Sequence, residues 1–82
     1  ELSISNRISL VPNPTSGEFK VILDGPPIPG YITIFDCFGN IVLKKFLKDS
    51  TTPLELMVEP GVYFVELSNE NGRFGSRLLI SN

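Results

Sequence analysis

Residues 61–80 read GVYFVELSNENGRFGSRLLI, and this stretch decides the fold. On both sides of Asn71-Gly72, apolar residues alternate with other residues at the period of a strand that has one buried face. The side chains expected to point inward are Tyr63, Val65, Leu67, Phe74, Leu78 and Ile80. Those expected to point outward are Val62, Phe64, Glu66, Arg73, Arg77 and Leu79. Because Asn-Gly is typical of tight turns in which both residues have positive φ, the stretch predicts an antiparallel β-hairpin.

Turn-forming residues divide the rest of the chain at regular intervals. The clusters of such residues are 12–17, 24–30, 36–40, 48–53, 59–61 and 69–72. A break roughly every ten to twelve residues is typical of a sandwich or barrel of short strands. The strand formers Val, Ile, Phe, Tyr and Thr make up roughly a third of the chain, and alanine, the best helix former, is absent. We therefore predict an all-β fold, an antiparallel sandwich of about seven strands.

Three of the expected strands have features of their own. Residues 2–10 are predicted to form a single strand with a bend at Asn6, and its inward side chains are expected to be Leu2, Ile4, Ile8 and Leu10. Residues 31–35 are apolar on both faces, which is typical of a central strand that is covered on both sides. Residues 41–47 also have helix-like spacing. We expect a strand there, because the segment is short and begins with two β-branched residues directly after a Gly-containing turn.

The composition narrows the class of protein. The chain has 82 residues, of which 41% are hydrophobic and 20% are charged, and its net charge is −2. It is too hydrophobic to be disordered, and it lacks the basic excess of a nucleic-acid binder. No apolar run reaches the roughly 18 residues of a membrane span, and there is no leader-like start. We expect residues 1–82 to be a single domain, and the first residue, Glu1 rather than Met, indicates a piece of a longer protein.

The residue types needed for common catalytic and metal sites are scarce. The chain has no histidine and a single cysteine, so it can form neither a Ser-His-Asp triad nor an internal disulfide. Asn69-Glu70-Asn71-Gly72 lacks the spacing of a calcium loop, and no two carboxylates are paired by the sequence as an acid and a base. We predict that the protein is not an enzyme and needs no cofactor or metal.

Three other features have both a functional and a structural interpretation. Cys37 lies in a turn without a basic neighbour and is interpreted as unreactive. Lys44-Lys45 with Lys48 is interpreted as a solvated or edge-protecting face rather than a binding patch. Phe38 and Phe64 could stack on a sugar, but membership of the core is the favoured interpretation.

Three sequence blocks carry a resemblance to a known family. The first is SLVPNPTSGEF at 9–19, the second ITIFDCFGNIV at 32–42, and the third PGVYFVEL at 60–67. In this order the blocks resemble the PNPxxGxF, I-x-I-[YF]-D-x-x-G-[RN]-x-V and S-G-[IV]-Y-[FL]-V segments of the type A C-terminal sorting domains of type IX (Por) secretion cargo from Bacteroidetes-like bacteria. The match extends from about residue 8 to residue 80.

The resemblance implies an immunoglobulin-like sandwich that acts as a sorting signal and has no active site. An upstream cargo would pass through the periplasm and then cross the outer membrane through the type IX translocon. A sortase-like surface peptidase commonly removes such a domain, and the cargo ends at the cell surface or in the medium. The alternatives from other classes are a carbohydrate-binding or adhesive immunoglobulin-like module, which needs a flat row of exposed aromatics, and a structural spacer.

The resemblance also singles out residues. The motif positions, which are expected to act mostly through folding, are Pro12, Asn13, Pro14, Gly17, Asp36, Gly39, Gly61 and Tyr63. The candidates for recognition by the translocon are Arg73, Arg77 and Leu79, which point outward on the last strand. Tyr63, on an inward face, is expected to need a hydrogen-bond partner for its hydroxyl. The family often ends on a basic residue, and this chain ends in Ser81-Asn82 instead.

Overall fold

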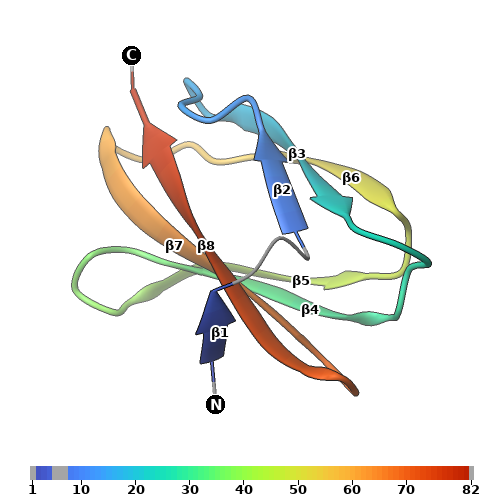
Figure 1. The fold of residues 1–82 in the computed structure, drawn as a ribbon. Helices are drawn as coiled ribbons and strands as arrows, with labels where there is room; N and C mark the ends of the chain where they lie inside the picture. The colour runs from blue at the N-terminus through green and yellow to red at the C-terminus, as the bar shows by residue number, and fades with distance from the viewer. Residues whose placement is uncertain (1, 5–7, 82) are drawn as a thin grey trace.

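The computed structural model describes residues 2–4 and 8–81, and these form eight strands and no helix. The strands are β1 (Leu2–Ile4), β2 (Ile8–Val11), β3 (Glu18–Leu23), β4 (Gly30–Phe35), β5 (Ile41–Leu47), β6 (Thr51–Glu55), β7 (Gly61–Asn69) and β8 (Gly72–Ile80). They form a five-stranded sheet in the order β1-β8-β7-β4-β5 and a three-stranded sheet in the order β2-β3-β6. Figure 1 shows the smaller sheet as a layer over one face of the larger one. The predicted all-β, immunoglobulin-like sandwich is confirmed.

A single apolar core lies between the two sheets. Both sheets contribute alternate residues to it, and Val21, Ile32, Ile34 and Leu78 have no exposed surface. The remaining buried apolar residues are Ile8, Leu10, Phe19, Leu23, Leu47, Leu54, Leu56, Tyr63, Val65, Leu67 and Ile80. Phe74 is partly buried against this cluster. The inward and outward faces predicted for β7 and β8 are therefore confirmed.

The first expected strand is divided between the two sheets. β1 pairs in parallel with β8 from Leu2↔Arg73 to Ile4↔Gly75, whereas β2 pairs antiparallel with β3 from Ile8↔Leu23 to Val11↔Lys20. The prediction of one strand over 2–10 is wrong, because the chain changes from one layer to the other between these two segments. The expected bend at Asn6 and the expected inward side chains of Leu2 and Ile4 lie outside the described residues.

β4 is central within its sheet, and its two faces are covered to different extents. It lies between β5 and β7, and Ile32 and Ile34 on its inner face have no exposed surface. On the outer face, the side chain of Tyr31 is 48% exposed. On the same face Thr33 is buried and Phe35 is half-buried. The expectation of two covered faces therefore holds for Thr33 and is wrong for Tyr31, because no further layer lies on this side among the described residues.

Two turns also differ from expectation. Pro53 lies within β6 rather than in the turn before it, which is possible because β6 is an edge strand, where a missing N–H breaks no ladder hydrogen bond. The β7–β8 hairpin is confirmed, but Asn71 does not have positive φ. Its N–H instead donates to the side-chain oxygen of Asn69 at 2.8 Å, so a side chain closes the turn.

Candidate functional site

The loop after β2 is hydrogen-bonded to the outer edge of β8. The Asn13 carboxamide donates to the carbonyl of Arg77 at 2.8 Å and accepts from the N–H of Leu79 at 3.0 Å. Pro12 and Pro14 on either side have no N–H to donate. In a parallel strand next to β8, a backbone N–H and C=O would make these two hydrogen bonds. The Asn13 side chain takes the place of that backbone.

Thr15 extends this pairing with its backbone. Its N–H donates to the carbonyl of Leu79 at 3.0 Å, and its carbonyl accepts from the N–H of Ser81 at 2.7 Å. The side chain is buried, and its hydroxyl donates to the carbonyl of Glu18 at 2.6 Å while accepting from the N–H of Gly17 at 3.1 Å. Sequence reasoning missed Thr15. A Thr side chain often bonds to the backbone two residues later in a turn, so the Thr15-Ser16-Gly17 pattern could have identified this residue from the sequence.

The loop and β1 together cover the outer edge of β8. β1 pairs with Arg73, Phe74 and Gly75, and the segment Asn13–Thr15 is bonded to residues 77–81. Figure 1 shows the two segments one after the other beside β8. The other edge of β8 pairs with β7 over its full length. The first sequence block is thus brought against the last strand.

Gly17 ends the loop in a conformation that a side chain would disturb. Its φ is +137°, and a Cβ built on it would lie 2.6 Å from the carbonyl oxygen of Leu56. The Gly17 carbonyl accepts from the N–H of Leu56 at 2.8 Å. Glycine is required because the backbone after β6 approaches this closely.

Asp36 organises the β4–β5 loop. Its carboxylate accepts from the N–H groups of Phe38 and Asn40, both at 2.9 Å, and from the Asn40 side chain at 3.1 Å. These donors, with the Asn40 backbone N–H the strongest, hold the pKa of Asp36 below its usual value. Gly39 has φ +86° and donates its N–H to the Asp36 carbonyl at 3.0 Å. The second sequence block therefore builds a closed turn.

The third block places Gly61 and Tyr63 at the start of β7. Gly61 pairs with Ile80 at the end of β8. Tyr63 is buried, and its hydroxyl donates to the carbonyl of Glu59 at 2.6 Å. The hydroxyl of Tyr63 has the partner that its inward position was expected to require, and it anchors the segment that enters β7.

The candidate recognition residues lie on the outer face of the five-stranded sheet. Arg73 forms an ion pair with Glu66 at 2.6 Å, so its charge is largely matched within the domain. Arg77 is exposed, and among the described residues its guanidinium has no hydrogen bond or ion pair. Leu79 is 41% exposed. Arg77 and Leu79 are therefore available to a partner, whereas Arg73 is already engaged.

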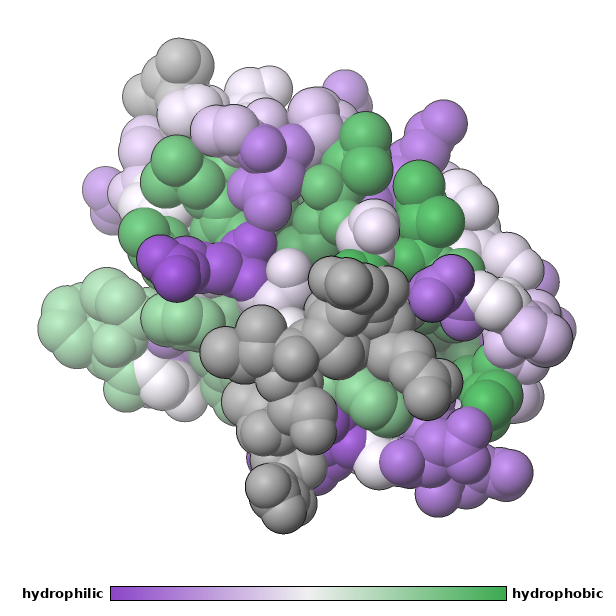
Figure 2. All heavy atoms as spheres, in the orientation of Figure 1, coloured by the Kyte–Doolittle hydropathy of each residue, from purple (hydrophilic) through white to green (hydrophobic). Residues whose placement is uncertain are grey.

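Two aromatic residues that were expected in the core are exposed. Phe38 is 86% exposed at the tip of the β4–β5 loop, and Phe64 is 49% exposed on β7, so neither belongs to the core. The loop projects from the body in Figure 1, and hydrophobic spheres lie at the same place in Figure 2. The aromatic pair on β4 and β5 does not form the flat platform typical of sugar binding. The ring of Tyr31 meets Phe46 edge to face at 5.2 Å, and the Lys44 ammonium lies 5.1 Å from its centroid.

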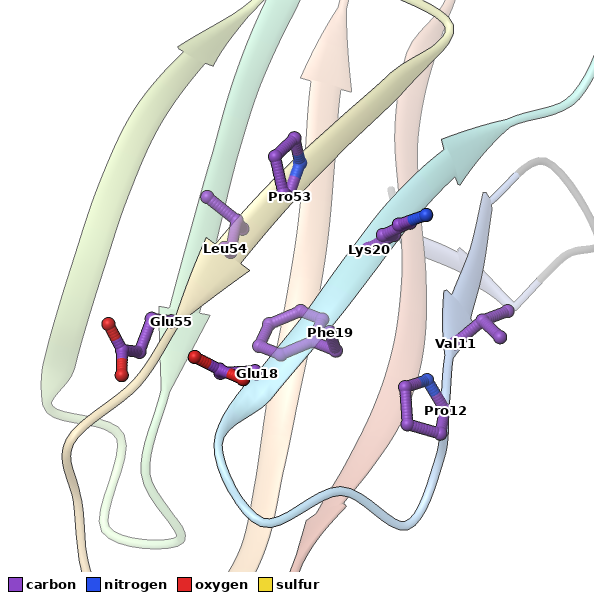
Figure 3. A pocket seen from close by; sticks show the side chains of 8 residues that line it. All are labelled: Val11, Pro12, Glu18, Phe19, Lys20, Pro53, Leu54 and Glu55. Carbon is purple, nitrogen blue, oxygen red and sulfur yellow. The ribbon is translucent and has the colours of Figure 1, made fainter.

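A shallow groove of about 410 Å³ crosses the outer face of the three-stranded sheet (Figure 3). Its walls include Pro12 from the loop and Pro53 from β6, and the register places Glu18 directly opposite Glu55. Sequence reasoning did not pair these two carboxylates. Both are exposed, so neither has the burial that tunes a carboxyl group for general acid–base work.

Metal sites and membrane-spanning helices are not found in the part of the chain that the structure describes. Residues 2–4 and 8–81 contain no cluster of three or more His, Cys, Asp or Glu side chains suited to a metal ion. In the same residues, no helix is long and apolar enough to cross a membrane. Cys37 is a free, exposed thiol in the β4–β5 turn.

Comparison with known protein families identifies the family of this chain. No curated protein matches the sequence significantly. A family model described as "Secretion system C-terminal sorting domain" matches residues 9–81, which includes all three sequence blocks and the last strand. With this match and the sandwich that it covers, the chain belongs to the family of secretion-system C-terminal sorting domains.

Proposed function

We propose that residues 1–82 form one address domain, which the outer-membrane type IX translocon reads after the domain has folded. Membership of the family gives the general function, a C-terminal sorting signal for type IX secretion. Such a signal takes its cargo across the outer membrane to the cell surface or the extracellular space. We add three points to this general function: the signal is recognised in its folded state, a cargo protein precedes it in the chain, and a particular surface is recognised.

The covered edges of β8 are the observation that carries this proposal. β7 pairs with one edge, while β1 and the Asn13–Thr15 segment occupy the other. A partner therefore has little free β8 backbone to which it could add a strand. Along β8 a partner would read outward side chains instead, and Arg77 and Leu79 are the exposed candidates, since Arg73 is paired with Glu66.

The motif residues support folding rather than contact with the partner. Asn13, Gly17 and Asp36 are occupied by hydrogen bonds or close contacts inside the domain. In the same way, the Tyr63 hydroxyl is bonded to the Glu59 carbonyl. This division suits a portable tag, because the same fold must form beside many different cargo proteins.

We also propose the finer assignments that the resemblance implies. The domain is a type A member, it passes through the periplasm with its cargo, and a sortase-like surface peptidase acts on it. It has no catalytic role of its own, in keeping with a family that is in general non-catalytic. The supporting observations are the three blocks at their family-like separations.

A matched pair of variants tests the proposed reading surface. Leu79→Glu and Val11→Glu place the same charge at positions that are 41% and 48% exposed, on the outer faces of the two different sheets. Each variant is fused to a periplasmically exported fluorescent protein in a strain with type IX secretion. We expect the Leu79→Glu fusion to remain in the periplasm and the Val11→Glu fusion to reach the surface. Normal surface display of a folded Leu79→Glu fusion would contradict the proposal.

A further inference from the structure

A small hollow lies on the outer face of the five-stranded sheet. It encloses about 300 Å³ between Phe35 of β4, Phe64 of β7 and Arg77 of β8. The register places these three residues side by side, since Phe35 pairs with Phe64 and Phe64 pairs with Arg77. The hollow is thus built across three neighbouring strands.

Gly75 is one of the residues that line the hollow. It occupies an outward position of β8 between Arg73 and Arg77 and pairs with Glu66 on β7. Because glycine has no side chain, nothing from Gly75 fills the space beside the Phe64 ring. Phe64 remains 49% exposed as a wall of this space, and an exposed aromatic at the edge of a hollow is typical of a binding surface.

The charge of this face is opposite to that of the whole chain. Its described charged residues are Lys44, Arg73 and Arg77 with Glu66, whereas the chain carries a net charge of −2. Glu66 neutralises Arg73, and Lys44 lies over the Tyr31 ring. Arg77 therefore has the unmatched cation nearest to the hollow, because among the described residues no group pairs with its guanidinium.

We propose that this hollow is the docking point for a protein segment that presents an apolar side chain next to a carboxylate. The apolar side chain enters between Phe35 and Phe64, and the carboxylate pairs with Arg77. Arg and aromatic residues around a small pocket are the typical anchors of protein–protein contacts, and Arg binds a carboxylate through two parallel hydrogen bonds. The inference rests on the proposed function, since it takes the partner to be a component of the export machinery.

Two other kinds of partner fit less well. An anionic membrane surface is usually bound by a cluster of four to eight basic residues, whereas this face has one unmatched arginine. A glycan would stack on flat aromatic faces. The ring of Tyr31 instead meets Phe46 edge to face and lies beneath Lys44.

Two variants and two matched controls test the docking point in the fluorescent fusion. Arg77→Glu reverses the charge at the hollow, and Lys20→Glu makes the same change at an exposed position on the other sheet. Phe64→Ser removes the aromatic wall, and Phe38→Ser removes an aromatic that is 86% exposed in a loop. Thermal melting of each purified 82-residue variant shows that the domain is still folded. A third variant, Arg77→Lys, keeps the positive charge.

We expect Arg77→Glu and Phe64→Ser to reduce surface display about tenfold or more, since loss of one anchoring contact changes affinity by about this factor. We expect Lys20→Glu and Phe38→Ser to match the unmodified fusion. We expect Arg77→Lys to give a display between those of the unmodified fusion and Arg77→Glu, because lysine keeps the charge but not the two parallel hydrogen bonds. Display of folded Arg77→Glu and Phe64→Ser at the unmodified level would overturn the docking point and leave the sorting function standing. If surface display falls for Phe64→Ser but not for Arg77→Glu, the partner does not use a carboxylate. That result would overturn the proposed partner and favour an uncharged, glycan-like ligand. An unmodified fusion that is not exported would overturn the sorting function, and the docking point with it.

Discussion

Replacing Gly17 by alanine is expected to destabilise the domain strongly, because this glycine combines an unusual backbone angle with a close backbone contact. Its φ is +137°, and an added Cβ would lie 2.6 Å from the Leu56 carbonyl oxygen. Gly25 provides a control for the angle alone. It has φ +76°, and no atom lies within 4 Å of the position of its Cβ.

The magnitude follows from two contributions. A side chain at positive φ costs about 1–2 kcal/mol. At Gly17 the new Cβ must also push away the Leu56 backbone, which strains the 2.8 Å hydrogen bond from the Leu56 N–H to the Gly17 carbonyl. Loss of such a bond costs about 0.5–1.5 kcal/mol. The free energy of unfolding should therefore fall by about 1.5–3.5 kcal/mol for Gly17→Ala, against about 1–2 kcal/mol for Gly25→Ala.

Urea denaturation and thermal melting of the two variants measure this difference. For a domain of this size, 1 kcal/mol shifts the melting temperature by about 4–8 °C, so the Gly17→Ala domain should melt about 6–28 °C below the unmodified domain. Equal losses for the two variants would show that the close contact with Leu56 contributes nothing. An unchanged melting temperature for Gly17→Ala would refute the reasoning altogether.

Three further variants test the other motif residues. Asn13→Ala removes two hydrogen bonds to β8 and should lower the free energy of unfolding by about 1–2 kcal/mol, measured with urea; a loss below about 0.3 kcal/mol would argue against the side chain as a stabilising link. Tyr63→Phe leaves the Glu59 carbonyl without its 2.6 Å donor and should cost about 1 kcal/mol in the same assay, a result that equal midpoints would contradict. The lowered pKa of Asp36 means that its stabilising contribution is present above the carboxyl pKa of the unfolded chain, about 3.9, and is lost as the pH falls through the lower folded value. Melting from pH 7 to pH 2.5 should therefore show a smaller acid loss for Asp36→Asn than for the unmodified domain, and identical pH profiles would exclude this role.

Local patterns were sufficient for much of the fold. The alternation in residues 61–80 predicted β7, β8 and their inward faces, because a strand with one buried face repeats every two residues. The inward position of Tyr63 predicted that its hydroxyl would have a partner, which is the Glu59 carbonyl. Each of these conclusions depends on neighbours within a few residues along the chain.

Contacts between distant segments were not predictable in the same way. The Asn13 carboxamide bonds to backbone groups of Arg77 and Leu79, 64 and 66 residues away, and no local pattern shows which strand edge a loop will meet. The division of residues 2–10 between two sheets has the same origin. Phe64 was assigned to the core from its type, although the alternation of β7 already placed it on the outer face.

The fusion of residues 1–82 to a periplasmically exported fluorescent protein tests the central claim most directly. The fusion is expressed in a strain that has type IX secretion and in a matched strain that lacks it, and fluorescence is measured in the periplasm, at the cell surface and in the medium. The account predicts surface or medium fluorescence in the competent strain only. Retention of a folded fusion in the periplasm of both strains would contradict the claim that this domain is a sufficient address.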